Sequence, residues 1–435
     1  MTTEITVPVI LQLALDLLDL DRALRIADLA VPQGVDWIEA GTPLIKSEGL
    51  AAVRALRERF PGRKIVADLK TADAGRVEME AAAKAGADYG IVLGAASEST
   101  IRECIEVGRN YGLGIGIDIL GIEHPERLAE RLADWGVAFL SVHCPIDVQM
   151  RGGGPFEMLA RLAKATRIPL AAAGGINSET APKAAAAGAS IVVIGGAVTK
   201  AADPARAAAD IRKALDSGAA VPTELFRRTG LEGVRDCLAR VSTANLSDAA
   251  HRRPCLADLR QITPGAKLIG PALTVRTAPG DFAKPVEAID HAEPGAVIAV
   301  EAGGCPPAVW GELASESAIQ HKLAGVVIDG GIRDTDEIRR LSFPAHARVV
   351  CSHAGHPKGL GEIGPPIRLA GVEVFPGDWL VGDADGVMVL PKDRVVELAN
   401  RAQDVLECEN RMRTEIREGR TLGQVAHLAK WEKKA

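Results

Sequence analysis

Residues Gly62–Gly75 read GRKIVADLKTADAG, and they show the pattern that recurs through the first half of the chain. A glycine precedes the apolar run KIVADLK, and three charged residues stand at or just after the end of that run: Asp68, Lys70 and Asp73. Glycine just beyond a helix supplies the left-handed residue that ends it. A short, nearly continuous apolar run is typical of a strand that is buried on both faces. The stretch therefore predicts a helix end, a parallel strand and a group of charges where that strand stops.

The same unit recurs on both sides of this stretch. Neighbouring glycines of the series from Gly34 to Gly136 lie 24 to 28 residues apart, and each one precedes an apolar run. The predicted strands are VILQLALD (9–16), VDWIEAG (35–41), KIVADLK (64–70), DYGIVLG (88–94), GIGIDIL (114–120), VAFLSVH (137–143), IPLAAAGG (168–175) and SIVVIGG (190–196). Eight strands that alternate with helices close as a (β/α)₈ TIM barrel, whose strand carboxyl ends meet at one catalytic face. A doubly wound open sheet is the alternative, and the absence of Gly-x-Gly-x-x-Gly after the first strand disfavours it.

The composition excludes several classes of protein. The 435 residues are 47% hydrophobic and 25% charged, as in a globular protein of two or three domains. A formal net charge of −6 argues against a nucleic-acid or membrane-surface partner. No apolar run approaches the ~20 residues that a membrane helix needs. The first residues hold no basic leader and the seven cysteines form no Cys-x-x-Cys pair, so we expect a cytoplasmic protein with reduced thiols.

The pattern of the sequence changes near Gly218. The barrel is expected to end there, and AAVPTE (219–224) reads as a short linker. The remainder holds turn-rich segments and ends in a charged helical tail. We predict two domains: a TIM barrel over residues 1–218, and a mixed α/β domain with a β-rich core over residues 219–435.

Ionisable residues stand at or near the ends of several predicted barrel strands: Asp16, Glu39, Asp68, Lys70, Asp118 and His143. Alternation along a strand points Asp68 and Lys70 to the same side. Glu39 and Asp68 offer two oxygen ligands for Mg²⁺, with water and substrate completing the octahedron. Lys70 can stabilise an enediolate, and His143 can move a proton near neutral pH. A single charge at a strand end is often a cap or a solvated group, but convergence of so many predicts catalysis.

Two glycine pairs follow the last two predicted strands. Gly174 and Gly175 end the seventh strand, and Gly195 and Gly196 end the eighth. Barrel enzymes often bind phosphate through backbone N–H groups of these two loops. Either pair alone marks any tight turn, whereas the adjacent pairs predict a phosphorylated substrate.

The segments LDLLDLDRAL, IEAGTPLIKSEG, IVADLKTADAG, SVH, AAAGGIN and IVVIGGAVT resemble the 3-hexulose-6-phosphate synthase family. This family lies in the orotidine-5′-phosphate decarboxylase superfamily, whose shared motif is Asp-x-Lys-x-x-Asp. The similarity runs from about Val9 to Asp216. It implies an aldol reaction, dependent on Mg²⁺, between formaldehyde and D-ribulose 5-phosphate, with a 3-hexulose 6-phosphate as product.

The resemblance also implies roles for single residues. Glu39 and Asp68 would hold the metal, and Asp73 would reach across a dimer interface. Asp16, Lys70 and His143 would serve proton transfer and the enediolate. The related 3-keto-L-gulonate-6-phosphate decarboxylases are the alternative. They carry an arginine three residues after the histidine, where this chain has Ile146, and a glutamate where it has Asp118, so both departures favour the synthase.

The second half contains WGELASESAIQHKLAGVVIDGGIRDTDEI (310–338). An Arg–Asp pair, Arg333 and Asp334, follows an apolar run and a glycine turn. Together with STANLSDA (242–249) and GDADGVMVLP (382–391), this stretch resembles the RraA-like family, which includes 4-hydroxy-4-methyl-2-oxoglutarate aldolases. The similarity spans about Pro222 to Pro391. The family also contains ribonuclease regulators that are not catalysts, so a scaffolding or regulatory second domain is the alternative.

This second resemblance implies another metal site. Asp334 would be a ligand to Mg²⁺ or Mn²⁺, and Glu337 would act through water. Arg333 would bind a carboxylate or carbonyl oxygen of a small 2-oxo acid. Backbone N–H groups from Gly311 to Leu313 would stabilise a pyruvate enolate, and Glu312 would position a water that carries a proton.

The two resemblances together imply a homo-oligomer. Synthases of the first family are dimers and RraA-like proteins are trimers. A hexamer with D₃ symmetry is the smallest closed assembly that satisfies both interfaces, and a simple dimer is the alternative.

Overall fold

The structure, a computed structural model, describes residues 8–426 and residue 428. It divides into two compact units. The first comprises the described residues up to Gln149, residues 153–228 and those from Glu407 onward. The second comprises residues 150–152 and 229–406. The chain therefore leaves the first unit, builds the second and returns to the first.

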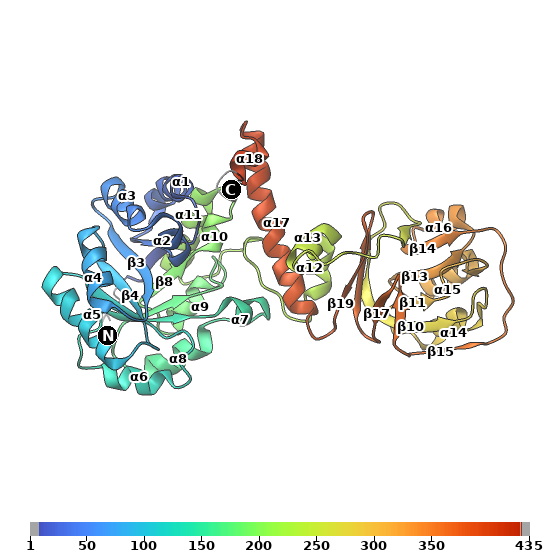
Figure 1. The fold of residues 1–435 in the computed structure, drawn as a ribbon, viewed down its shortest axis with the longest axis horizontal. Coiled ribbons are helices and arrows are strands. Elements are labelled where there is room, and N and C mark those ends of the chain that lie inside the picture. Colours follow the sequence, from blue (N-terminus) through green and yellow to red (C-terminus); the bar gives the residue numbers. More distant parts are fainter. Residues whose placement is uncertain (1–7, 427, 429–435) are drawn as a thin grey trace, which may run out of the picture. The chain divides into compact units, whose positions relative to one another are not determined.

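The first unit contains the predicted TIM barrel (Figure 1). Eight parallel strands form a closed ring, because β8 pairs with β1 from Ile10 opposite Ile191. The strands are β1 (Ile10–Leu15), β2 (Trp37–Ala40), β3 (Lys64–Thr71), β4 (Tyr89–Leu93), β5 (Gly114–Asp118), β6 (Phe139–His143), β7 (Leu170–Ala173) and β8 (Ile191–Ile194). Each coincides with one of the eight apolar runs of the sequence.

Helices follow each strand in chain order and surround the ring (Figure 1). They are α1 (Leu20–Ala30), the 3₁₀ helix η1 (Val31–Gln33), α2 (Thr42–Glu48), α3 (Ala51–Arg59), α4 (Gly75–Lys84), α5 (Glu98–Tyr111), α6 (Pro125–Leu132), α7 (Ile146–Met150), α8 (Phe156–Ala165), α9 (Ala181–Ala186), α10 (Gly196–Thr199) and α11 (Pro204–Ser217). The sequence specifies many of their ends. In α5, the Ser97 hydroxyl accepts a hydrogen bond from the Thr100 N–H, and left-handed Gly112 ends the helix. Gly62 departs from the predicted pattern, because α3 ends at Arg59 with Phe60 as its cap, and Gly62 is not left-handed.

Apolar side chains of the strands fill the barrel at its amino-terminal end. The rings of Trp37 and Tyr89 stack with centroids 4.4 Å apart, and Phe139 packs edge-on against Tyr89. Buried Val66 and Ile91 belong to the same cluster. Because this end is filled, the polar residues of the barrel gather at the carboxyl ends of the strands.

Strand β3 is irregular where its charged residues begin. Its pairing with β4 shifts register between Ala67 and Thr71, and Lys70 adopts a left-handed backbone conformation with φ of 49°. A local irregularity of this kind re-aims a side chain at the rim of a barrel. The backbone strain at a non-glycine residue is typical of a functional site.

The end of the chain returns to the barrel unit. Helix α17 (Val395–Arg417) enters this unit at Glu407, and α18 (Leu422–Val425) follows it. An Arg22 Nη2 atom of α1 lies 2.9 Å from the Glu415 Oε2 atom and donates to the Val425 carbonyl at 3.1 Å. The predicted single boundary after Gly218 does not coincide with the limits of the two compact units, because residues 219–228 and the described residues from Glu407 onward belong to the barrel unit.

The second unit is a mixed α/β domain, as predicted. Its sheet runs in the order β19-β18-β10-β11-β13-β14-β9, with parallel pairing from β10 to β14 and antiparallel strands at the flanks. Its elements are α12 (Val234–Arg240), α13 (Thr243–Ala249), β9 (Arg260–Gln261), β10 (Leu268–Thr277), α14 (Ala283–His291), β11 (Val297–Glu301), β12 (Ala308–Trp310), α15 (Glu312–Gln320), β13 (Gly325–Ile332), α16 (Thr335–Leu341), β14 (Ala345–Val350), β15 (Gly361–Ile363), β16 (Ile367–Leu369), β17 (Val372–Val374), β18 (Trp379–Asp383) and β19 (Gly386–Leu390). Across the described part of the chain, no helix combines the length and the apolar character that crossing a membrane requires.

Candidate active site

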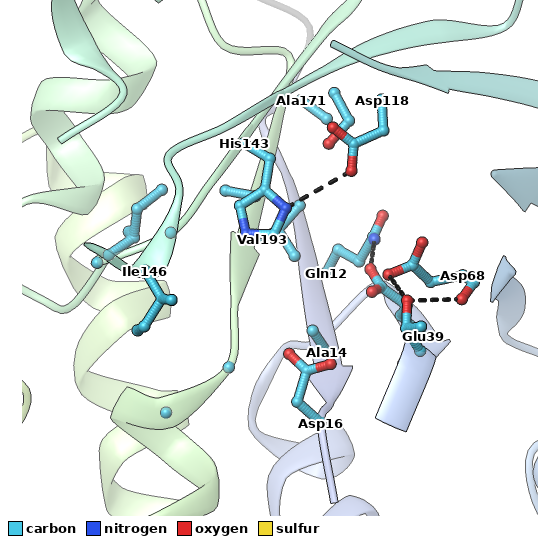
Figure 2. Close-up of a pocket in the computed structure, with 18 of the residues that line it drawn as sticks. Gln12, Ala14, Asp16, Glu39, Asp68, Asp118, His143, Ile146, Ala171 and Val193 are labelled. Atoms are coloured by element: carbon cyan, nitrogen blue, oxygen red, sulfur yellow. Dashed lines mark hydrogen bonds and ion pairs between the residues drawn. The ribbon is translucent and has the colours of Figure 1, made fainter. Parts of the chain in front are cut away.

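A cavity of about 480 Å³ lies at the carboxyl ends of the barrel strands. Its walls hold most of the ionisable residues that the sequence predicted for the barrel site: Asp16, Glu39, Asp68, Lys70, Asp118 and His143. Figure 2 shows the acidic side chains and His143 directed into the same space. The strand ends therefore converge as the barrel topology requires.

Lys70 lies at the centre of the charges. Its Nζ atom is 3.0 Å from an Asp68 oxygen and 2.7 Å from the Asp118 Oδ2 atom. Burial alone would lower the pKa of Lys70, but the charges of Asp68 and Asp118 outweigh burial and raise it. Lys70 is therefore a firmly protonated ammonium group that faces a substrate cavity.

Asp118 joins Lys70 to His143. The His143 Nδ1 atom lies 3.5 Å from the same Asp118 oxygen that contacts Lys70, and Figure 2 draws this contact. The other Asp118 oxygen accepts the backbone N–H of Leu120 at 2.9 Å. Burial would raise the pKa of Asp118, but hydrogen bonding from His143 and the charge of Lys70 lower it to about 2. Since Nδ1 of His143 faces a carboxylate, Nε2 is the ring atom left to exchange a proton with a substrate.

Two further carboxyl groups carry the opposite shift. Burial, followed by the charge of Asp68, raises the pKa of Asp16. Burial, followed by the charges of Asp68 and Asp16, raises the pKa of Glu39 well above its usual value. The side-chain amide of Gln12 donates to Glu39, whereas its Oε1 atom is buried and has no hydrogen-bond partner among the residues that the structure describes. Three neighbouring carboxyl groups and one unsatisfied oxygen make this wall of the cavity favourable for a cation.

The cluster of carboxyl groups makes the predicted metal ligands, Glu39 and Asp68, suitable for Mg²⁺. Glu39 and Asp68 supply hard oxygen atoms, and Asp68 is further positioned by the Thr42 hydroxyl, which donates to it at 2.8 Å. Among residues 8–426 and 428, no three His, Cys, Asp or Glu side chains are grouped closely enough to hold a metal ion. A Mg²⁺ ion here would therefore complete its shell with water and substrate oxygens, as this ion commonly does.

The glycine pairs form the other end of the cavity. Gly174, Gly175, Gly195 and Gly196 all line it. Gly174 and Gly175 are left-handed, with φ of 94° and 74°. At Gly174, a side chain would also collide with the Cys144 carbonyl, because an added Cβ would lie 2.6 Å from that oxygen. The backbone can thus approach a bound group closely at this position.

Asp73 and Ile146 differ in their relation to the cavity. Asp73 is exposed, its Oδ1 atom accepts the Ala74 N–H at 2.7 Å, and it does not line the cavity of its own chain. Its expected role across a dimer interface stays a prediction. Ile146 does line the cavity, so an apolar side chain stands where the related decarboxylases have arginine.

The predicted site of the second unit lies where β12 and β13 end. Asp334 is left-handed, with φ of 57°, and precedes α16. Its Oδ2 atom accepts the Glu312 N–H at 3.3 Å and lies 3.2 Å from the Arg333 Nε atom. Gly311 precedes α15, and an added Cβ there would lie 2.6 Å from the same Asp334 oxygen. The structure thus brings Gly311, Glu312, Arg333 and Asp334 together.

The other two residues predicted for this site are more open. Glu337 lies in α16 and pairs with Arg340 at 3.1 Å. The side chain of Leu313 is 77% exposed to solvent, although its backbone is part of the same turn of α15. Their functional roles stay predictions.

Comparisons with known proteins agree with this division of the chain. The family described as "Orotidine 5'-phosphate decarboxylase / HUMPS family" matches residues 10–211, and the RraA-like family, described as "Aldolase/RraA", matches residues 243–389. A 3-hexulose-6-phosphate synthase of Mycobacterium gastri is 40% identical over 205 residues, which are 47% of this chain and 99% of that protein. Through its barrel, this chain belongs to the 3-hexulose-6-phosphate synthase family.

Further relatives extend the comparison. The 3-hexulose-6-phosphate synthase of Bacillus subtilis strain 168 is 36% identical over 209 residues, covering 48% of this chain and 99% of that protein. A solved structure of the RNA-processing inhibitor RraA from Thermus thermophilis is 30% identical, with a TM-score of 0.33, and covers 35% of this chain and 94% of that one. The chain is therefore a fusion of a synthase-family barrel with an RraA-like domain, and it is an enzyme of the carbon–carbon lyase class.

Sequence reasoning missed several residues of the synthase-family site. Asp118 belongs to the predicted group of strand-end charges, but the sequence does not show its contacts with Lys70 and His143. Gln12 had a visible signal, as the one polar residue inside an otherwise apolar run. Lys200 and Phe226 line the cavity as well, yet no pattern in the sequence pointed to either.

Proposed function

We propose that the barrel catalyses the reversible aldol addition of D-ribulose 5-phosphate to formaldehyde, giving a 3-hexulose 6-phosphate. One observation carries this proposal. A protonated Lys70, held between Asp68 and Asp118 and linked to His143, faces a cavity whose other end is lined by paired-glycine loops. Such a cavity suits a substrate that is anionic at one end and forms a carbanion at the other.

The loops after β7 and β8 would bind the phosphate group. Gly174, Gly175, Gly195 and Gly196 bring backbone close to the ligand, and the short helix α10 begins at Gly196. Lys200 lines the same end of the cavity and adds a positive charge. The remote phosphate would then fix the position of the reacting carbon against Lys70 and His143.

The reaction needs one proton removed and one returned. His143 Nε2 would take a proton from C1 of the sugar. The electron pair of the broken C–H bond would then be delocalised toward the C2 carbonyl, giving the enediolate. The ammonium group of Lys70 would stabilise the negative charge on its oxygen atoms. The C1 carbon then attacks the carbon of formaldehyde: one C–C bond forms, the π bond of the aldehyde C=O breaks, and the resulting alkoxide takes the proton back from His143.

Glu39, Asp68 and Asp16 would prepare the sugar for this step. A divalent cation bound by Glu39 and Asp68 would polarise the carbonyl and hydroxyl oxygens of the substrate. Asp16, whose pKa is raised by burial and by Asp68, can carry a proton closer to neutral pH than an ordinary aspartate. It would hold or relay the proton that moves between substrate oxygens.

The test is a direct assay with isotope labelling. Purified full-length chain is incubated with Mg²⁺, D-ribulose 5-phosphate and ¹³C-formaldehyde, and the products are analysed by mass spectrometry and NMR. We expect a hexulose phosphate that carries the label at a single carbon. Conversion of 3-keto-L-gulonate 6-phosphate to a pentulose phosphate, without any formaldehyde-dependent product, would instead identify the related decarboxylase activity.

For the second unit, we propose cleavage of a small 2-oxo acid through a pyruvate enolate, assisted by Mg²⁺ or Mn²⁺. Asp334 would be the metal ligand, with Glu337 acting through water, and Arg333 would bind a substrate oxygen. The N–H groups of Glu312 and Leu313, at the first turn of α15, would face the enolate, and the Glu312 side chain would position a water. The grouping of Arg333, Asp334 and the Glu312 N–H supports this proposal.

Pyruvate in D₂O offers a sharp test, because an enolate-forming site exchanges the methyl protons for deuterium. We expect metal-dependent exchange, followed by NMR, and release of pyruvate from 4-hydroxy-4-methyl-2-oxoglutarate. Absence of both reactions, with the second unit folded, would favour the scaffolding or regulatory alternative.

A further inference from the structure

Phe226 is an unusual part of the barrel cavity. It lies in the segment between the two family-matched ranges, residues 10–211 and 243–389, and its side chain lines the cavity. Its backbone is left-handed, with φ of 55°, although its side chain is bulky. Such a conformation is an outlier for a residue of this size and persists only where the surroundings impose it.

The ring of Phe226 lies directly on the predicted phosphate loop. A Cβ atom added to Gly196 would come within 2.8 Å of the ring Cζ atom, so the ring occupies the space beside the glycine. The Lys200 Nζ atom lies 5.5 Å from the ring centroid, and the Arg228 Cζ atom lies 4.3 Å from it. Phe226 therefore has two cations on its ring, and one of them, Lys200, also lines the cavity.

Two segments of the first unit hold Phe226 in this conformation. Its N–H donates to the Glu407 Oε1 atom of α17 at 2.9 Å, a buried hydrogen bond. The Asn177 amide, in the loop after β7, donates to the carbonyls of Leu225 at 3.3 Å and of Phe226 at 3.4 Å. Asn177 and Glu407 are themselves buried, at 3% and 4% exposure. The backbone at Phe226 is thus fixed from both sides.

From these contacts we infer that Phe226 is a positioning residue for the phosphate end of the substrate, and that Glu407 of the returning helix holds it in place. The inference rests on the proposed binding of a sugar phosphate in this cavity. The ring closes the cavity beside Gly196, excludes water from the phosphate loops and fixes the position of Lys200. Hydrogen bonds and ionic contacts to a phosphate are stronger where water is excluded.

This role predicts a specific kinetic signature. The reacting carbon lies at the Lys70 end of the cavity, so Phe226 contributes to binding and leaves the chemical step to other groups. Loss of the ring should then raise KM for D-ribulose 5-phosphate while kcat changes little. Helix α17 would then support the substrate site of the barrel through Glu407, although its sequence lies beyond both matched ranges.

The experiment compares full-length Phe226→Ala and Phe226→Leu with wild type. We expect Phe226→Ala to raise KM about tenfold with kcat within about twofold of wild type, and Phe226→Leu to lie between them. The inhibition constant of inorganic phosphate should rise in parallel, because phosphate alone samples the same end of the cavity. Phe60→Ala, which removes a half-buried ring at the end of α3 and outside the cavity, should leave KM unchanged.

A second pair of variants tests the hydrogen bond from Glu407. Glu407→Gln keeps an oxygen that can accept the Phe226 N–H, whereas Glu407→Ala removes it. KM should rise in Glu407→Ala and stay closer to wild type in Glu407→Gln. Equal effects of the two Glu407 variants, or an unchanged KM in a folded Phe226→Ala protein, would overturn the inference.

Calorimetry separates this inference from the proposed function. If wild type does not turn over but binds inorganic phosphate, the proposed reaction fails while Phe226 is still testable. In that case the Kd of phosphate must weaken about tenfold in Phe226→Ala, and an unchanged Kd would refute the role.

Discussion

The two candidate sites of this chain differ in how far their charged side chains are exposed to solvent. In the barrel, the side chains of Lys70, Asp68 and Asp118 are 23%, 8% and 1% exposed. In the RraA-like unit, those of Arg333 and Asp334 are 41% and 38% exposed. The electrostatic energy of a buried charge depends strongly on the neighbouring charges, whereas water screens the interactions of exposed charges.

The difference in burial affects how strongly each site should depend on its single charges. The barrel cavity holds a complete electrostatic network before any substrate arrives, so single changes within it should be severe. The second site consists of half-exposed charges beside an exposed Leu313. Its dependence on single charges should be smaller.

The substitution Lys70→Ala should give the largest difference between the two sites. Removing the cation from the buried network should lower kcat of the formaldehyde-dependent reaction by about 10³-fold, because the enediolate loses its principal positive charge. Pyruvate exchange at the second site should stay at the wild-type level, and circular dichroism should show an intact fold. Near-normal turnover of the barrel would contradict the assignment of Lys70.

Asp334→Asn tests the exposed site in the same way. We expect pyruvate exchange to fall by about 10²-fold while the barrel reaction is unaffected, since metal-ligand loss acts only locally. Asp336→Asn is the matched control, because Asp336 lies two residues away and pairs with Arg339 on the surface. Equal activity in Asp334→Asn and wild type would point to a scaffolding domain.

The sequence predicted the barrel well for a physical reason. Parallel strands that are buried on both faces are continuous apolar runs, and charges at their ends must converge once the ring closes. The pairing of Lys70 with Asp118 was less accessible, because it joins two strands that are not neighbours in the sheet. Phe226 could not be predicted, since its conformation depends on Glu407, 181 positions further along the chain.

Acid should weaken the barrel through Asp118. The folded state keeps the pKa of Asp118 at about 2, below the usual 3.8, so its contribution to stability is complete above pH ~4 and is lost as pH falls toward 2. This contribution is about 2 kcal/mol. In urea unfolding, Asp118→Asn should therefore be less stable than wild type at pH 6, and the gap should narrow at pH 3. Asp216→Asn, an exposed helix residue paired with Arg212, should show no such narrowing.

Glu39 should behave in the opposite sense. Burial and the charges of Asp68 and Asp16 raise its pKa, so its negative charge opposes folding at neutral pH when no cation is bound. Glu39→Gln should raise Tm by a few degrees without Mg²⁺, and added Mg²⁺ should stabilise wild type more than the variant. A lower Tm for Glu39→Gln without metal would show that the charge is already compensated.

The smallest expected effect concerns Asp73, which tests whether the barrel site is complete within one chain. Asp73 is exposed and lies outside its own cavity, so Asp73→Asn should lower kcat/KM only several-fold, and only if the residue completes a neighbouring subunit's site. Mixing Asp73→Asn and Lys70→Ala subunits gives the decisive measurement. In a two-fold assembly, about a quarter of the sites in an equilibrated mixture would combine an intact Lys70 with an intact Asp73. Activity above the mean of the two separate variants would place Asp73 across the interface, and native mass spectrometry of the same samples would distinguish the expected hexamer from a dimer. Activity equal to that mean would show that Asp73 does not act across the interface.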